Sequence, residues 1–444
     1  MERNVLQTQG PFELAYSFGR LVHAAGPAIT RMVWLLSLLL LLPAAVQAQD
    51  FTYTINSGSV TITGYTGPGG AVVIPDTIEG LPVTVIGPQA FIGNTNLKAL
   101  TIPNSVITVD NNAFQSCAGL TNVTIGNSVT AIGNDAFAGC RSLSGIMIPD
   151  SVISIGNQAF LDCSGLTTVE MGSRVASFAA GLFANCTSLT IVPIPDGVTG
   201  VGSFAFANCG SLKSVVIPNS VESIGDGVFI NCGSLTNVAL PEFVSYIGHS
   251  MFEGCTSLAN VTIHDAVSRI GNRAFERCVS LANVKIPDNV TTIGVRAFAS
   301  CSSLTNMTIG TGINSIGDLA FGDCLNLTSV YFIGSAPDGS TFVFFESNNT
   351  IIYYLPGTAG WEATFAGRPT VLWNPKPQIT GPADPFGFTI TGSDNLVIVV
   401  EAATSLANTD WTPVSTNTLT GGSSPFSDPQ WMNHPARYYR LRSP

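Results

Sequence analysis

The sequence has few charged side chains and only four histidines. Lysine, arginine, aspartate and glutamate make up 10% of its 444 residues, whereas a typical soluble domain has about 25%. The 28 acidic residues outnumber the 17 basic ones, and the formal net charge is -11. A nucleic-acid-binding protein presents a basic stripe, and this sequence shows none. A disordered acidic chain is also excluded, because 45% of the residues are hydrophobic.

Residue groupings that carry chemistry are scarce as well. His249 and His264 stand at turn positions, without the context of a serine nucleophile and an oriented base. The acidic residues are too scattered for a general acid–base pair or a calcium loop. The cysteines lack the short paired spacings of zinc sites. We therefore expect no enzymatic activity, no catalytic residues, no metal and no cofactor.

Residues 1–48 have the pattern of an amino-terminal extension followed by a signal peptide. Arg31 precedes an apolar run at 33–42, and small residues after it predict cleavage and a mature chain that begins near Gln49. The run is shorter than the roughly 20 residues of a membrane span, and an uncleaved signal anchor is the alternative. The long stretch before Arg31 indicates that translation starts at Met32 or nearby.

One period of 23 residues organises most of the chain. Phenylalanine recurs eleven times at this spacing, from Phe91 to Phe321, and leucine follows each one by six residues. Ten copies have cysteine three residues after the phenylalanine, and the first copy has Asn94. A fixed repeat without insertions is typical of a solenoid. The predicted interior ladder is represented by Phe114, Phe137, Phe160, Cys117, Cys140 and Cys163.

Each copy contains a predicted strand and a return path. In the copy that runs from residue 278 to 298, the stretch 281–286 alternates as a half-buried strand does. Pro287 then turns the chain, and Val290 and Ile293 are expected to point inwards. A coil of this kind cannot bury its apolar face alone, so the copies must stack.

The repeated unit, C-x-x-L-x-x-V-x-I-P-x-x-V-x-x-I-G-x-x-A-F, resembles the BspA-type leucine-rich repeat of exported bacterial proteins. The resemblance covers about residues 81–332. It implies a mostly β fold, a leucine-rich-repeat solenoid of 23-residue coils with parallel sheets, and adhesion or binding of extracellular ligands. It names no ligand for this chain. The fourth copy departs from the pattern, with Phe178 and Ala179 in place of Ile and Gly, which predicts a local change in that coil.

The cysteine ladder allows two chemical states. Neighbouring coils would place these side chains about 5 Å apart, which a disulfide can bridge, and export would permit oxidation. A buried thiol, in contrast, behaves as a small hydrophobe, and Asn94 at the same position fits a ladder that bonds to the backbone. The pattern favours buried thiols, and disulfides between neighbouring coils stay open.

Four further segments flank the predicted array. Residues 49–80 predict a β-rich cap that includes a hairpin, and residues 333–373 predict a cap rich in aromatic side chains. Residues 374–385 are rich in proline, which is typical of a stiff linker. Residues 386–444 predict a small antiparallel β-domain, and they resemble carboxyl-terminal modules of other exported bacterial proteins.

Candidate binding residues lie on the outward side of the predicted strands. The central outward position recurs from Thr101 to Tyr331 and becomes unusually apolar in the middle copies. Exposed apolar patches mark interaction sites, although unselected variation on a face without a ligand would give the same pattern. The candidate strip comprises Met147, Glu170, Ile191, Pro193, Val216 and Ala239.

These observations predict a secreted or cell-surface, adhesin-like scaffold for protein–protein interaction. Its partner would be an extracellular or cell-surface protein, and neither a nucleic acid nor a stable membrane span after signal cleavage is expected. The alternative is a glycan-binding or accessory module of an extracellular polysaccharide-processing system. In that alternative Trp411, Trp431, Tyr438 and Tyr439 would form a sugar-stacking platform, whereas the competing interpretation places these rings in a core.

Overall fold

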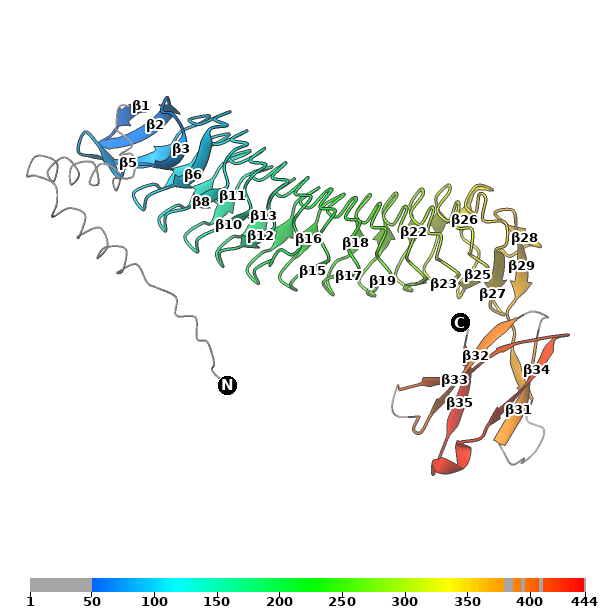
Figure 1. The fold of residues 1–444 in the computed structure, drawn as a ribbon. Coiled ribbons are helices and arrows are strands. Elements are labelled where there is room, and N and C mark those ends of the chain that lie inside the picture. Colours follow the sequence, from blue (N-terminus) through cyan, green and yellow to red (C-terminus); the bar gives the residue numbers. More distant parts are fainter. Residues whose placement is uncertain (1–49, 379–385, 393–395, 407–409, 443–444) are drawn as a thin grey trace, which may run out of the picture. The chain divides into compact units, whose positions relative to one another are not determined.

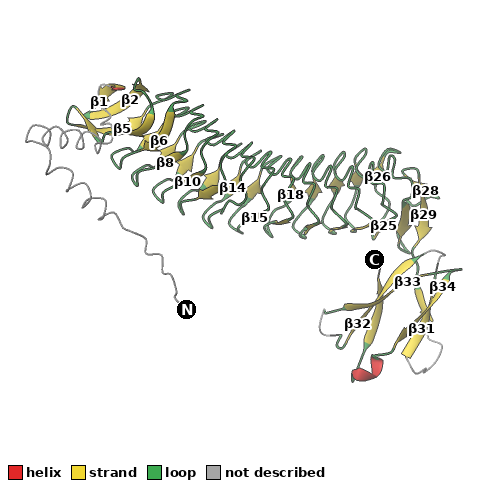
Figure 2. Ribbon diagram, in the orientation of Figure 1, coloured by secondary structure: helices red, strands yellow, loops and turns green. Residues whose placement is uncertain are grey.

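The computed structural model describes residues 50–378, 386–392, 396–406 and 410–442. From Phe51 onwards they belong to one compact unit. The predicted signal peptide and its cleavage site before Gln49 lie outside the described residues. Within the described residues the fold is nearly all β, with short 3₁₀ turns such as Trp431–Asn433 (Figure 2). The predicted fold class is confirmed: parallel coils form a solenoid, and antiparallel sheets follow it (Figure 1).

Most coils contribute two strands, and within each sheet of the solenoid the equivalent strands of successive coils pair in parallel. For example, Val216 lies opposite Ala239, and Ile270 lies opposite Ile293, one period away in each case. The first strand column contains β3 (Gly70–Val73), β6 (Leu97–Thr101), β8 (Asn122–Thr124), β10 (Gly145–Met147), β12 (Thr168–Glu170), β15 (Ser214–Val216), β17 (Asn237–Ala239), β19 (Asn260–Val261), β21 (Asn283–Ile286), β23 (Asn306–Ile309), β25 (Ser329–Phe332), β27 (Ile351–Tyr354) and β29 (Arg368–Leu372).

The second strand column follows the turn in each coil. Apart from the first, its strands are only two residues long, because the chain turns again at once. They are β5 (Leu81–Ile86), β7 (Thr108–Val109), β9 (Ala131–Ile132), β11 (Ser154–Ile155), β13 (Ser177–Phe178), β14 (Gly200–Val201), β16 (Ser223–Ile224), β18 (Tyr246–Ile247), β20 (Arg269–Ile270), β22 (Thr292–Ile293), β24 (Ser315–Ile316) and β26 (Asp338–Gly339).

Short antiparallel elements stand at both ends of the two columns. At the amino-terminal end, β1 (Phe51–Asn56) and β2 (Ser59–Tyr65) form a hairpin, and β2 continues the second column by pairing in parallel with β5. The hairpin turn is made by Ser57 and Gly58, both with positive φ, as a tight two-residue hairpin requires. Two further short strands, β4 (Thr77–Ile78) and β28 (Thr364–Phe365), pair antiparallel with β5 and β29.

The carboxyl-terminal module consists of two three-stranded antiparallel sheets. One contains β30 (Lys376–Gln378), β31 (Phe386–Thr391) and β34 (Ser423–Asp428), and the other contains β32 (Val397–Ala403), β33 (Thr412–Thr418) and β35 (Tyr438–Arg442). Strands β31 and β32 carry apolar side chains at buried positions, among them Phe388, Ile390, Ile398 and Val400. These side chains form the core of the module.

A continuous stack of phenylalanine rings fills the interior of the solenoid. The rings from Phe91 to Phe344 are buried, and consecutive centroids lie 4.9 to 5.8 Å apart. The stack therefore reaches one coil beyond Phe321, where the sequence pattern ended. Phe344 keeps the 23-residue spacing, but Ser347 replaces the cysteine that marks the other copies. The loss of that marker concealed the last regular coil.

The fourth copy changes the coil locally, as its sequence predicts. Phe178 is buried where the other copies have Ile, and its ring lies 6.1 Å from Phe183 and 6.0 Å from Phe206. The second column is divided at this coil, because β11 ends one sheet and β13 begins the next. The column is divided a second time between β16 and β18, where both coils have isoleucine, so the larger side chain does not by itself account for such a break.

Replacing one ring of the stack should destabilise the solenoid strongly. Phe206 is fully buried between Phe183 and Phe229, and truncation of a buried phenylalanine costs about 3 to 5 kcal/mol. We expect Phe206→Ala to lower the free energy of unfolding by this amount, measured by chemical denaturation and circular dichroism. Phe204 is 48% exposed, and Phe204→Ala should change the same free energy by less than about 1 kcal/mol. Equal effects would show that the stack contributes little.

Candidate functional site

The candidate strip lies on the outward face of the first strand column, at the middle coils. Its residues come from β10, β12, β15 and β17 and from the segment between β12 and β15. Alternation along each strand turns Val215 and Val238 into the core and leaves Val216 and Ala239 outside. All six residues of the strip are exposed. The three largest apolar ones, Met147, Ile191 and Val216, are 61%, 57% and 76% exposed.

Pro193 interrupts the sheet in the centre of the strip. Residues 191–194 form no strand, and a single bridge joins Thr168 to Ile191. Proline has no backbone N–H to donate to a ladder, so it is tolerated only where the pairing is broken. The strip therefore consists of three parts. Strands β10 and β12 form the first, the coil without a strand forms the second, and strands β15 and β17 form the third.

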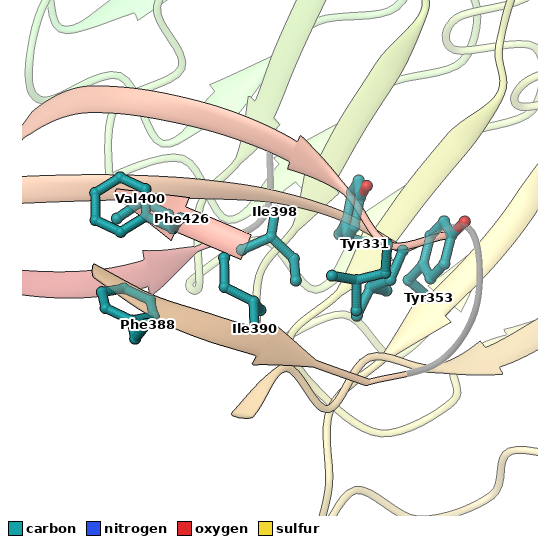
Figure 3. Close-up of a cluster of buried hydrophobic side chains, with 9 residues drawn as sticks. Tyr331, Tyr353, Phe388, Ile390, Ile398, Val400 and Phe426 are labelled. Atoms are coloured by element: carbon teal, nitrogen blue, oxygen red, sulfur yellow. The ribbon is translucent and has the colours of Figure 1, made fainter. Parts of the chain in front are cut away.

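Tyr331 keeps the outward register of its column but, unlike the residues of the strip, it is not exposed to solvent. Its side chain is only 2% exposed, because it shares a buried cluster with Tyr353, Phe388 and Ile390 (Figure 3). The two tyrosine rings stack at 4.9 Å. The carboxyl-terminal module thus packs on the outward face of β25 and β27. It covers the same column whose middle part carries the strip.

The ten cysteines are free and buried. Each Sγ–H donates a hydrogen bond of 3.1 to 3.3 Å to the phenylalanine carbonyl oxygen of the preceding coil. Burial raises the pKa of the Cys117 thiol to about 12. At the two ends of the ladder, Asn94 Oδ1 accepts the N–H of Leu97 (3.2 Å) and Ser347 Oγ–H donates to the Phe321 carbonyl (2.7 Å).

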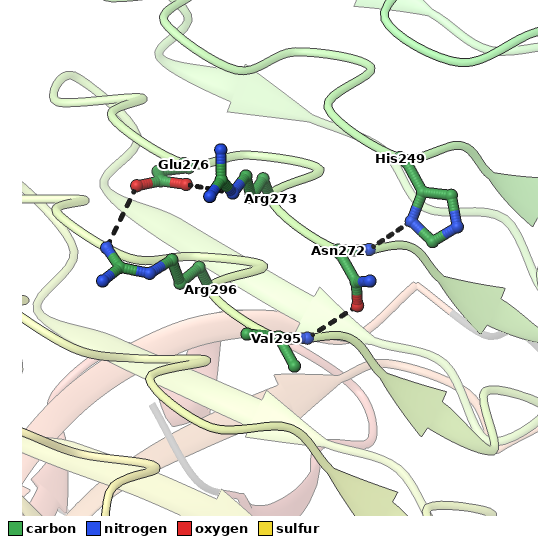
Figure 4. A network of polar contacts seen from close by, with 6 residues as sticks. All are labelled: His249, Asn272, Arg273, Glu276, Val295 and Arg296. Atoms are coloured by element: carbon green, nitrogen blue, oxygen red, sulfur yellow. Dashed lines mark hydrogen bonds and ion pairs between the residues drawn. The ribbon is translucent and has the colours of Figure 1, made fainter.

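His249 has a structural role in one of the turns between coils. Its Nδ1 accepts the backbone N–H of Asn272 at 2.9 Å, and Asn272 Oδ1 in turn accepts the N–H of Val295 at 2.9 Å (Figure 4). His249 thus occupies a position that asparagine fills in the next coil. Beside it, Glu276 pairs with the guanidinium groups of two arginines, at 3.5 and 3.4 Å. These are Arg273 and Arg296.

The aromatic side chains of the alternative glycan platform separate into two groups. The guanidinium carbon of Arg440 lies over the Trp411 ring, 4.6 Å from the centroid of that ring. Trp431 instead packs against Phe386 at 6.1 Å, and the Tyr439 ring stacks on Phe386 at 5.1 Å. Trp411 and Trp431 thus have different contact partners, and neither ring packs against the other in these contacts.

Sequence reasoning missed the buried ion pairs of the carboxyl-terminal module. Glu401 is buried between Arg440 and Arg442, whose Nε atoms lie 2.7 and 2.5 Å from its carboxylate. Burial alone would raise the pKa of Glu401, but the two arginines outweigh it and hold that pKa below its usual value. Glu401 lies about 40 positions before the two arginines. This spacing belongs to no repeat, so no pattern in the sequence indicated that the three residues pair.

Among the described residues, no group of three or more His, Cys, Asp or Glu side chains is arranged to hold a metal ion. Nor does any helix in this part of the chain have the length and apolar character needed to cross a membrane.

Stacked parallel coils with buried leucine, phenylalanine and cysteine ladders define a leucine-rich-repeat solenoid. The family model of the BspA type leucine rich repeat region matches residues 84–212 and 222–351, in six copies. These two segments make up more than half of the chain. The chain belongs to the BspA-type leucine-rich repeat family.

Solved structures to which this chain is similar come from several bacteria. A leucine rich cell surface protein from Faecalibacterium prausnitzii A2-165 is 28% identical, with 72% of this chain and 96% of that chain covered and a TM-score of 0.49. A leucine rich repeat protein of T. pallidum is 32% identical over 48% of this chain and 90% of that chain (TM-score 0.38). The pneumococcal vaccine antigen PcpA is 20% identical over 70% and 93% (TM-score 0.51), a likeness in fold. No curated protein matches the sequence.

Proposed function

We propose that this chain is an exported, non-enzymatic scaffold at the cell surface that binds a protein partner through the candidate strip. The observation that carries the proposal is the exposure of Met147, Ile191 and Val216 on one sheet face. Isolated apolar residues on a surface need no explanation, but Pro193, Val216 and Ala239 occupy the same outward position in three successive coils, which favours an interaction site. The strip spans five coils, from Met147 to Ala239.

Two further observations support the proposal. The same sheet face already accepts a protein surface at Tyr331 and Tyr353, where the carboxyl-terminal module packs. Membership of the BspA-type family supports a repeat array whose extended surface serves binding. The export of the chain to the cell surface is supported by the signal pattern in residues 1–48.

A pull-down tests the proposal and separates it from the glycan alternative. The chain from Gln49 to Pro444 is immobilised and exposed to extracellular proteins and to extracellular polysaccharides in separate experiments. The whole chain is needed, because the core of the carboxyl-terminal module includes Tyr331 and Tyr353 from the solenoid. We expect retention of a protein that is lost after protease treatment of the input. Retention of polysaccharide alone, unaffected by protease, would contradict the proposal and favour the glycan-binding alternative.

A further inference from the structure

A hollow of about 490 Å³ opens beside the first residues of the strip. Three consecutive coils contribute to it where they turn out of the first strand column. Its lining includes Asn127 from the first coil, Met147, Pro149 and Asp150 from the second, and Glu170 from the third. The hollow therefore joins the strip directly, because Met147 and Glu170 belong to both.

The base of the hollow is closely packed. Gly172 stands where the preceding coil has Pro149, and a Cβ atom at Gly172 would come within 2.4 Å of the Pro149 carbonyl oxygen. Only glycine allows this approach, so the third coil closes directly on the second. The lining thus combines buried residues with exposed ones: Ile148, Pro149 and Gly172 are buried, and Asn127, Met147, Asp150 and Glu170 are exposed.

The walls of the hollow carry negative charge. Asp150 and Glu170 both line it, and the lining contains no lysine, arginine or histidine. The Asp150 carboxylate is oriented by the backbone N–H and the hydroxyl of Ser173, at 2.7 and 2.9 Å. These two hydrogen bonds hold the pKa of Asp150 below its usual value. The bond from the backbone N–H has the larger effect, and the positive charge of Arg174 adds a smaller one. The carboxylate keeps its charge at neutral pH.

Exposed apolar side chains lie in the coils that follow these carboxylates. Ile191 follows in the coil after Glu170, and Val216 lies one coil further. Coils in a parallel sheet are about 4.8 Å apart, so Glu170 and Val216 are separated by about 10 Å along the stack. An extended chain advances about 3.3 Å per residue. Three residues of such a chain would span the distance.

We propose that the hollow receives a lysine or arginine side chain of the protein partner, and that an apolar residue three positions away covers Val216. The inference rests on the proposed function and adds the chemistry of the partner. The alkyl part of a basic side chain fits against Met147 and Pro149, and its charged end reaches Asp150 and Glu170. The partner segment runs along the stack of coils in an extended conformation.

The probe for this inference is a pair of capped heptapeptides that differ at one position. One contains a valine and, three residues later, a lysine, and the other has glutamate in place of the lysine. Binding to residues 49–444 is followed by nuclear magnetic resonance of ¹³C-labelled methionine methyl groups, at millimolar peptide. We expect the lysine peptide to shift the Met147 signal and the glutamate peptide to leave it unchanged. Equal shifts, or no shift with either peptide, would overturn the inference.

Charge-removing variants locate the binding site. Asp150→Asn combined with Glu170→Gln should weaken lysine-peptide binding about three- to tenfold, since exposed ion pairs contribute up to about 1 kcal/mol each. The control combines Glu222→Gln with Glu242→Gln, two exposed acids away from the hollow, and it removes the same charge. If Val216→Lys abolishes binding of the lysine peptide, but the Asp150/Glu170 variant binds this peptide as tightly as its control does, the hollow inference fails and the strip stands. If the Asp150/Glu170 variant binds the lysine peptide as its control does, and Val216→Lys binds it as the unchanged chain does, both proposals fail.

Discussion

The solenoid is expected to unfold as the pH rises from about 9 to about 11, because its ten buried thiols resist ionisation. Burial raises the pKa of Cys163 and Cys209 to about 12, from an ordinary value of 9.0. The unfolded chain therefore loses these protons near pH 9, while the folded chain keeps them. Between the two values the folded state binds more protons, so its stability falls as the pH rises.

The size of this effect follows from the number of thiols. Each raised pKa removes about 1.4 kcal/mol of stability per pH unit above the ordinary value. Ten thiols together remove on the order of 10 kcal/mol per pH unit, which is comparable to the total stability of an ordinary domain, about 5 to 15 kcal/mol. Below pH 9 the stabilising contribution of the buried thiols is fully present.

Circular dichroism and thiolate absorbance, recorded together against pH, check this expectation. The two signals should change in the same narrow range of pH. The control is a triple variant in which Cys163, Cys186 and Cys209 become serine, and it should unfold at a higher pH. The chain itself shows that serine fits the ladder, since Ser347 donates to the Phe321 carbonyl and accepts the N–H of Cys324. Thiolate absorbance that rises near pH 9 without loss of circular dichroism would contradict the account.

Two lysines in the candidate strip should abolish partner binding. Met147→Lys and Val216→Lys would place charges on a surface that the partner must desolvate, and central interface residues contribute about 2 kcal/mol or more each. We expect the double variant to weaken binding by at least about 100-fold. The measurement is the dissociation constant of the captured protein, determined by surface plasmon resonance.

A matched control exists on the second strand column. Ser154 and Ser223 are exposed there and are separated by three coils, as Met147 and Val216 are. Ser154→Lys with Ser223→Lys adds the same charge to the same coils and should leave the dissociation constant unchanged. Circular dichroism confirms that both variants are folded. Equal loss of binding in the two variants would point to net charge, and unchanged binding in both would remove the strip from the account.

Much of the fold could be predicted because each coil repeats the same physical requirements. Phenylalanine and cysteine recur every 23 residues because stacked coils present the same interior position at each level. The end of the array was harder to place, since Phe344 keeps the period but Ser347 breaks the cysteine pattern. A serine there makes the same hydrogen bond as the thiols, and a period search that accepts either residue would have found the last coil.

The contacts between the solenoid and its carboxyl-terminal module could not be predicted. Tyr331 follows the outward register of its column, and only the position of Phe388 and Ile390 in space explains its burial. The hollow beside Met147 is a further example, because it depends on the turns of three coils and on the approach of Gly172 to Pro149. The candidate strip itself could be named in advance, since alternation along a strand fixes which side chains face outwards.

Photo-cross-linking from position 216 tests the central claim most directly. A photoreactive phenylalanine analogue replaces Val216, which is 76% exposed and is the most exposed of the three large apolar residues of the strip. A second chain carries the analogue in place of Ser223 on the other strand column. After capture of the partner and irradiation, we expect a covalent complex from position 216 and none from position 223. A complex from position 223 alone would contradict the claim that the partner binds the outward face of the first strand column.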